Sequence, residues 1–222
     1  GITYKAAWDA IDAMNNLFGR PLVSAQAGGR KGGGAELTPA GVRVVAAFHR
    51  LEGELARTLK EMEPELAGTG IAGGQLVWGF LTRTSARNAL RGTISDLRSD
   101  GVNTEVTLAL TPEVALTSVI TQGSAERLGL FPGREAIALI KASLVILAAP
   151  DDARRTSAAN RLEGLVSRRE DGPVNSEITL DLADGKTVTA VITTRSADTL
   201  GLRIGEPAAA LIDAAHILLA VD

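Results

Sequence analysis

The chain has 222 residues and a formal net charge of −3, and its residues are 45% hydrophobic, 22% charged and 3% aromatic. This composition is typical of a globular protein of one to three domains, and the net charge argues against nucleic-acid binding by overall positive charge. The chain has no cysteine, which excludes disulfides, cysteine-ligated zinc and thiol catalysis, and it has neither a signal-peptide pattern nor an apolar run of about 18 residues, so we expect a cytoplasmic protein without membrane contact.

Residues 1–40 predict a helix followed by a β-hairpin. Thr3 is a suitable N-cap for a helix over residues 4–18, in which Ala7, Ile11, Met14 and Phe18 share one apolar face. Residues 19–21 end this helix. A short strand over residues 22–26, a glycine-rich loop over residues 28–34 and a second strand over residues 35–37 describe a hairpin wing.

The glycine-rich loop contains Arg30 and Lys31. Residues 1–60 carry eight Lys or Arg against five Asp or Glu, so this part of the chain is the better candidate for a polyanionic partner. A DNA-contacting wing and an ordinary surface turn have similar weight. A phosphate-binding loop is excluded, because no Ser or Thr follows Lys31 to complete that motif.

The next predicted element is a helix that starts at Thr38-Pro39, an N-cap followed by proline. Its apolar residues follow steps of three and four, which favours packing against a partner helix or, with similar weight, against its own domain; they are Val44, Phe48, Leu51, Leu55 and Met62. Pro64 is predicted to end the helix. Residues 67–74 contain four glycines and indicate a hinge, whereas the apolar residues 76–81 fit a helix or a strand.

The remainder of the chain is an internal duplication at a fixed offset of 72 residues. The matched pairs include Thr84/Thr156, Asn88/Asn160, Gly92/Gly164, Thr121/Thr193, Ser124/Ser196, Gly129/Gly201 and Gly133/Gly205. In the first copy we predict strands over residues 90–97, 105–110, 115–120, 136–140 and 144–147, with a short helix over residues 121–128 capped by Thr121. Five short strands and one helix favour a small barrel of the OB type.

The stretch Thr84-Ser85-Ala86-Arg87-Asn88 brings two hydroxyls, a guanidinium and an amide into five residues. Such a loop can direct several donors at one anion, although a polar turn that caps nearby backbone is the simpler interpretation of the loop alone. With two histidines and no cysteine in the chain, pairs of a nucleophile and a base are scarce. We therefore expect a binding protein with no catalytic residues and no metal site.

Two regions carry a resemblance to a known family. Residues 1–17, GITYKAAWDAIDAMNNL, and Leu37-Thr38 resemble the recognition-helix region of ModE-type molybdate-dependent transcriptional regulators, and each repeat resembles a Mop (also called TOBE) domain. The resemblance implies a winged helix-turn-helix whose first helix and strand precede Gly1, so we expect this chain alone to bind DNA weakly and without sequence preference. The DNA-facing residues would be Thr3, Tyr4, Lys5, Trp8, Arg30 and Lys31.

The resemblance also implies a domain plan. The fold class is α+β, with an incomplete winged-helix part and two OB-like five-stranded barrels. Residues 1–66 form the winged-helix part with its dimerisation helix, residues 67–81 a linker, residues 82–150 the first Mop domain and residues 151–222 the second. The active form would be a homodimer.

The family's oxyanion residues carry over to the first repeat. The resemblance implies that molybdate, or tungstate as its analogue, lies between two subunits and contacts Ser85, Arg87 and Lys141 of one chain, where Lys141 lies on the fifth strand, and Thr121 and Ser124 of the other. The second repeat keeps Ser157, Thr193 and Ser196 but has Ala159 and Asp213 in the positions of Arg87 and Lys141. We therefore expect oxyanion binding at the first repeat only.

Three functions follow from these features. The leading one is a molybdate-sensing transcriptional regulator that binds operator DNA. The alternative is a cytoplasmic molybdate storage or buffering protein without DNA binding, against which residues 1–60 argue, because storage needs no recognition helix. A regulatory domain of a transport ATPase is third, and it would require a Walker motif, which this sequence lacks.

Overall fold

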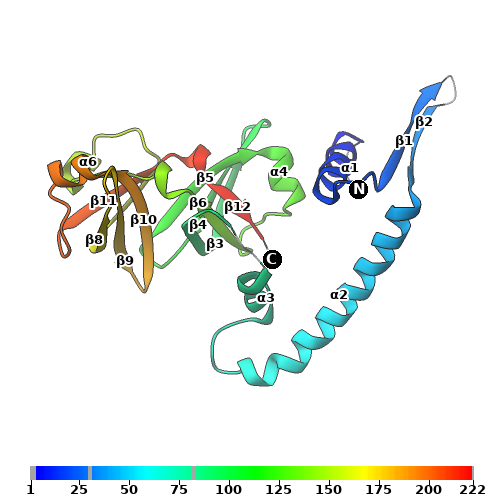
Figure 1. Cartoon of the computed structure of the whole chain (residues 1–222), viewed down its shortest axis with the longest axis horizontal. Helices are drawn as coiled ribbons and strands as arrows, with labels where there is room; N and C mark the ends of the chain where they lie inside the picture. Colours follow the sequence, from blue (N-terminus) through cyan, green and yellow to red (C-terminus); the bar gives the residue numbers. More distant parts are fainter. Residues whose placement is uncertain (1–3, 30–31, 82–83, 222) are drawn as a thin grey trace. The chain divides into compact units, whose positions relative to one another are not determined.

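A computed structural model describes residues 4–29, 32–81 and 84–221. The chain divides into two compact units, residues 1–81 and residues 82–222 (Figure 1), and each is described by itself.

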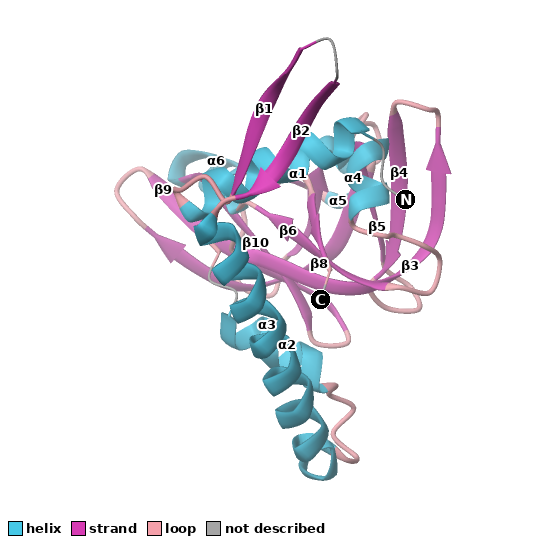
Figure 2. Cartoon of the chain, turned by 90° about the vertical axis from the view of Figure 1, so that its right-hand side faces the viewer, coloured by secondary structure: helices cyan, strands magenta, loops and turns pink. Residues whose placement is uncertain are grey.

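The first unit contains the predicted helix and hairpin. Helix α1 (Tyr4–Phe18) precedes the antiparallel strands β1 (Val23–Gly29) and β2 (Gly32–Leu37), which extend as a narrow ribbon in Figure 2. Helix α2 (Pro39–Leu66) and helix α3 (Gly73–Leu81) follow. The apolar residues 76–81, for which the sequence left helix and strand open, are therefore helical.

Side-chain hydrogen bonds fix the junctions of the first unit. The Asn15 carboxamide oxygen, on α1, accepts from the backbone N–H of Leu22 at 2.7 Å. Thr38 caps α2 as predicted, since its hydroxyl oxygen accepts from the N–H of Gly41 at 3.0 Å. Gly41 in turn allows the start of α2 to approach the hairpin, because a Cβ there would lie 2.1 Å from the carbonyl oxygen of Leu22.

The prediction that Pro64 ends the long helix was wrong, since Pro64 lies inside α2, which continues to Leu66. Proline removes one backbone donor, but its fixed φ is helical, and two further residues complete the last turn at little cost. Much of the apolar face of α2 is exposed, including Phe48 at 61% and Leu51 at 65%. None of the helices in the described part of the chain is long and apolar enough to cross a membrane.

The second unit consists of two five-stranded antiparallel sheets, each curled into a half-barrel, which confirms the predicted OB-like class. The first copy supplies β3 (Asn88–Ser99), β4 (Asn103–Ala109), β5 (Ala115–Thr121), α4 (Gln122–Arg127), β6 (Glu135–Ile140), the single-turn helix η1 (Ala142–Leu144) and β7 (Ile146–Ala148). After α5 (Pro150–Ala153), the second copy supplies β8 (Asn160–Asp171), β9 (Asn175–Ala183), β10 (Lys186–Thr193), α6 (Thr194–Thr199), β11 (Pro207–Ile212), η2 (Ala214–His216) and β12 (Leu218–Ala220).

The two copies exchange their last strands. The first sheet has the order β12-β6-β3-β4-β5 and the second the order β10-β9-β8-β11-β7. Strand β7 of the first copy thus pairs with β11 of the second, and β12 pairs with β6. Neither sheet is complete without a strand from the other copy, so the two predicted barrels are interlocked.

Each long strand is bent at a β-bulge. The pairing of β3 with β4 shifts between Ile94 and Asp96, and that of β8 with β9 shifts at the equivalent place, between Val166 and Arg168. A bulge bends a strand and increases its twist, which accounts for the curled sheets. The side chains inside form a shared apolar core from both copies; its fully buried members include Ile94, Leu108, Leu116, Ile140, Ile178, Leu180, Val188, Ile212 and Ile217.

Gly164, which faces β9 from β8, should not tolerate a side chain. An alanine Cβ there would lie 2.3 Å from the backbone oxygen of Asp181, so the strands must separate. We expect Gly164→Ala to lower the free energy of unfolding by about 1–3 kcal/mol, measured by urea denaturation. Gly123→Ala in α4 is the control, because its Cβ would meet nothing closer than an Arg127 guanidinium nitrogen at 3.8 Å. Equal stabilities of the two variants would contradict the close approach.

Candidate oxyanion site

The loop over residues 84–87 leads directly into β3. The Thr84 hydroxyl oxygen accepts from the backbone N–H of Ala86 at 3.1 Å, which holds the loop in a tight turn. Strand β3 pairs with β6 so that Asn88 is opposite Ile140, and this register brings Lys141 to the same end of the sheet as the loop. Lys141 follows β6 and is the N-cap residue of η1. The prediction that it lies on the fifth strand was therefore wrong, since it lies between the fourth strand, β6, and the fifth, β7.

Ser85 and Lys141 line one cavity of about 410 Å³. Leu139 and Leu144 of the first copy form part of its wall, and the second copy contributes Ala215, His216 and Leu218. The cavity therefore lies between the two copies. A lysine ammonium and a serine hydroxyl at one cavity are donors suited to an oxyanion. The contribution of the second copy was not visible in the sequence, because His216 lies far along the chain and in no motif.

Arg87 has a counter-ion within the chain. Its guanidinium forms an ion pair with the Glu177 carboxylate of β9, with a nitrogen–oxygen distance of 3.1 Å. The Arg87 side chain is 67% exposed, whereas that of Glu177 is 17% exposed. Arg87, one of the two basic residues of the predicted set, is thus accessible to solvent, but it is paired with a carboxylate from the second copy. No pattern in the sequence indicated this ion pair.

Thr121 and Ser124 meet at the start of α4. The Thr121 hydroxyl caps the helix by accepting from the N–H of Ser124 at 3.3 Å, and it donates to the Ser124 hydroxyl at 2.9 Å. Arg127, which sequence reasoning missed, donates to the same Ser124 oxygen at 3.0 Å and adds a positive charge there. Within the described residues, no hydrogen bond or ion pair joins this pair to Ser85, Arg87 or Lys141.

The asparagine of each repeat joins the two copies through hydrogen bonds from its side chain to the backbone of the other copy. Asn88 is 3% exposed; its amide donates to the carbonyl oxygen of Thr189 at 2.9 Å, and its carboxamide oxygen accepts from the N–H of Thr189 at 2.6 Å. Asn160, equally buried, forms the same two bonds with Thr117, at 2.8 and 2.6 Å. The asparagine that recurs in both copies therefore has a structural role, and the residues before Asn88 form the candidate ligand loop.

The second copy keeps the hydroxyl frame of the first. Thr193 and Ser196 lie at the start of α6 with their hydroxyl oxygens 2.7 Å apart, matching Thr121 and Ser124. Asp213 stands in the position of Lys141, and its carboxylate accepts from the N–H of Ala215 at 2.8 Å. A carboxylate fixed at this position repels an anion, and Ala159 supplies no compensating charge.

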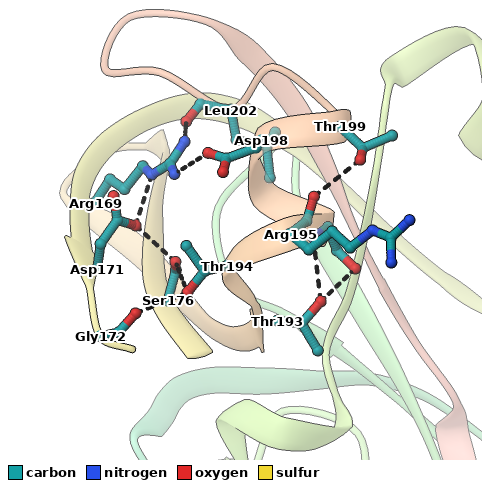
Figure 3. Close-up of polar contacts among 11 residues, drawn as sticks. Arg169, Asp171, Gly172, Ser176, Thr193, Thr194, Arg195, Asp198, Thr199 and Leu202 are labelled. Carbon is teal, nitrogen blue, oxygen red and sulfur yellow. Dashed lines mark hydrogen bonds and ion pairs between the residues drawn. The ribbon is translucent and has the colours of Figure 1, made fainter. Parts of the chain in front are cut away.

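Helix α6 is tied to its sheet by Arg169, which occupies the position of Leu97 in the first copy (Figure 3). The Arg169 guanidinium contacts the Asp171 carboxylate at 2.8 Å, the Asp198 carboxylate, and the carbonyl oxygen of Leu202 at 3.0 Å. The hydrogen bond from Arg169, followed by one from Ser176, holds the pKa of Asp171 below its ordinary value. Hydrogen bonds from the same guanidinium to Asp171 and then Asp198 raise the pKa of Arg169.

This cluster predicts a pH-dependent contribution to stability. A carboxyl whose pKa is lower in the folded than in the unfolded chain stabilises the fold above its unfolded pKa, and this contribution is lost as the pH falls through the folded pKa. We expect Asp171→Asn to have a lower melting temperature than the wild type at pH 7, with the difference shrinking below about pH 4. Asp151→Asn, an exposed carboxylate of α5, controls for net charge. A difference that does not change with pH would contradict the prediction.

The residues predicted to face DNA belong to the first unit. Tyr4 and Lys5 begin α1, and Trp8 lies one turn later and is half-buried. Thr3, Arg30 and Lys31 lie outside the described residues. The structure therefore confirms the helix and the hairpin that would carry these side chains, and their contact with DNA stays a prediction.

Comparison with known proteins identifies the second unit. The TOBE domain family matches residues 84–147 and 156–219, the two copies of the repeat. The solved structure of the cytoplasmic molybdate-binding protein ModG, with molybdate bound, superposes with a TM-score of 0.61 at 39% identity, covering 64% of this chain and all of that one.

Relatives of similar length match the whole chain, including the first unit. The molybdenum-pterin-binding protein MopA of Rhodobacter capsulatus is 52% identical over 221 residues, 100% of this chain and 83% of that protein. The molybdenum transport protein ModE of Azotobacter vinelandii is 43% identical over 99% of this chain and 83% of its own length, and the DNA-binding transcriptional dual regulator ModE of Escherichia coli is 34% identical over the same shares. Taken with the paired TOBE domains, this similarity shows that the chain belongs to the ModE-type family.

Proposed function

We propose that the chain is a molybdate-sensing transcriptional regulator that works in the cytoplasm as a homodimer and is not an enzyme. The observation that carries the proposal is the cavity lined by Ser85 and Lys141, in a TOBE copy whose ModG neighbour was solved with molybdate bound. Arg87 follows the lining residue Ala86 in the chain but is not itself one of the residues that line the cavity. Lys141 and Arg87 supply two positive charges for a dianion, and tungstate would bind as an analogue. Binding at the first copy would then control the attachment of the winged-helix part to operator DNA.

The division of the site into two groups of residues supports a dimer. Ser85, Arg87 and Lys141 lie at one end of the first sheet, whereas Thr121 and Ser124 start α4, and no contact between described residues unites them. A second chain would bring its Thr121 and Ser124 hydroxyls to the Ser85 cavity. Four or five hydrogen bonds to a charged ligand, each contributing roughly 1.5–3 kcal/mol, are sufficient for about micromolar affinity after the costs of association.

Titration calorimetry of the purified chain tests the proposal, with molybdate, tungstate, sulfate and phosphate as ligands. The charged side chains of the site, Arg87 and Lys141, donate hydrogen bonds and do not accept them. Phosphate near neutral pH carries a proton that needs an acceptor, so molybdate should bind at least about tenfold more tightly. Phosphate binding as tight as molybdate binding would refute the expected selection for fully deprotonated oxyanions.

The second candidate is a molybdate storage or buffering protein without DNA binding. It is favoured by the 52% identity to MopA, which is named for molybdenum-pterin binding. Helix α1 and the β1–β2 hairpin favour the regulator, because storage requires neither. DNA from the promoters of molybdate-responsive genes, titrated with and without molybdate, separates the two: a molybdate-dependent change in affinity supports the regulator.

The exposed apolar face of α2 predicts the dimer contact. Phe48 and Leu51 expose most of their surface and lie on the predicted helix seam. We expect Phe48→Glu combined with Leu51→Glu to convert a dimer to a monomer, because four carboxylates would meet at the contact. The measurement is molar mass by light scattering. Arg50→Glu, at an exposed position on the same helix, should leave the dimer intact, and a wild-type chain that is already monomeric would contradict the prediction.

A further inference from the structure

We propose that the Glu177 carboxylate of the second copy opposes oxyanion binding by charge repulsion and thereby sets the affinity of the site at the first copy. This inference rests on the proposed function, because it assigns a regulator to the same oxyanion site. It also gives the second copy, which lacks the charges for a site of its own, a direct electrostatic effect on the first.

The contact is built from a fixed carboxylate and an accessible guanidinium. Glu177 lies on β9 and pairs with Arg87 at 3.1 Å and with Arg168 at 3.4 Å. Two guanidinium groups thus hold a carboxylate whose side chain is only 17% exposed. Arg87, at 67% exposed, presents the rest of its guanidinium to solvent, where a ligand would approach.

A guanidinium has five N–H donors, so Arg87 can keep Glu177 and still contact an oxyanion. The negative charge of Glu177 then opposes the ligand across the width of one guanidinium. Replacing the carboxylate by a neutral amide of the same shape removes that repulsion and retains an acceptor for Arg87. The affinity for a dianion should rise, and the gain should depend on the charge of the ligand.

The repeat supplies a matched control. Glu105, on β4, occupies the position of Glu177 in the first copy. The residue that corresponds to its guanidinium partner is Ala159, so Glu105 has no equivalent of Arg87 to hold. Glu105→Gln therefore makes the same chemical change at the equivalent position of the first copy, but it does not break an ion pair equivalent to that of Glu177 with Arg87.

The experiment compares wild type, Glu177→Gln and Glu105→Gln in calorimetric titrations with molybdate, a tetrahedral dianion, and perrhenate, a tetrahedral monoanion. For charges about 6 Å apart in a water-like dielectric, Glu177→Gln should bind molybdate about tenfold more tightly and perrhenate about threefold more tightly. Glu105→Gln should match the wild type for both ligands. Melting temperatures establish that each variant is folded, and Glu177→Ala, which should change affinity in the same direction, replaces the glutamine variant if that one does not fold.

Weaker binding of both ligands by Glu177→Gln would overturn the inference, because it would mean that the carboxylate orients Arg87 for the ligand. Equal affinities of Glu177→Gln, Glu105→Gln and wild type would also overturn it. A wild type and variants that bind no oxyanion at all would instead overturn the proposed function. Binding by wild type that is tightened only by the changes at Glu177 supports both.

Discussion

Replacing Arg87 by alanine should greatly weaken molybdate binding, which in the wild type should reach a stoichiometry near one molybdate per chain. Arg87 supplies one of the two positive charges of the predicted site, and a lost charge-assisted hydrogen bond together with its Coulomb attraction amounts to about 2–4 kcal/mol. The dissociation constant should therefore rise roughly 30- to 1,000-fold. Calorimetric titration measures both the stoichiometry and the affinity.

The second copy provides the reciprocal test of the same prediction. It keeps Ser157, Thr193 and Ser196, and it differs from the first copy in having Ala159 and Asp213 where the first has Arg87 and Lys141. Combining Ala159→Arg with Asp213→Lys should raise the stoichiometry from one molybdate per chain toward two. A wild type that binds two molybdates, or an Arg87→Ala variant that retains half of the binding, would mean that the second copy binds despite Asp213.

The five strands and one α-helix of each copy could be predicted because the sequence contains each of them twice. A strand pattern that recurs at a fixed offset of 72 residues is supported by two independent stretches of sequence. The same doubling located Thr121 and Thr193 as N-caps, and both hydroxyls accept from the N–H three residues later. Local rules were sufficient here, because caps and strands depend on neighbours in the chain.

The exchange of β7 and β12 could not be predicted, because it concerns which copy a strand pairs with. Ile146 and Leu218 are equivalent positions in the repeat, so the sequence gives the same pattern whether each strand pairs within its own copy or with the other. The pairing of Arg87 with Glu177 depends on this same packing between copies. The residue types of the candidate site could therefore be predicted, but the residues of the second copy that surround it could not.

The error at Pro64 has a different origin. Pro64 was expected to break the helix, as proline does in a helix interior. Its effect, however, depends on how many backbone hydrogen bonds it removes. Two residues from the end of α2, at most one backbone donor is missing. Sequence rules of this kind state a preference, and the remaining length of the element decides the outcome.

Replacing Asn88 by alanine should lower the free energy of unfolding by about 3–5 kcal/mol, the largest loss of stability that we expect from a single polar side chain in the second unit. Asn88 is 3% exposed and joins Thr189 of the second copy to the carbonyl oxygen of Ile140 in the first. Alanine would leave the N–H and the carbonyl of Thr189 buried without these partners, at about 1–3 kcal/mol for each group. Urea denaturation measures the change.

Asn160→Ala separates stability from ligand binding. Asn160 is buried to the same extent and forms the equivalent bonds to Thr117 and Ile212, so its loss should destabilise the unit by a similar amount. Only Asn88, however, directly follows Arg87 and fixes the end of the loop that contains Ser85. At a temperature where both variants are folded, Asn88→Ala should weaken molybdate binding several-fold more than Asn160→Ala, because a loosened loop must be ordered again when the ligand binds. Equal losses of affinity in the two variants would mean that the hydrogen bonds of Asn88 stabilise the unit as a whole and do not position the loop.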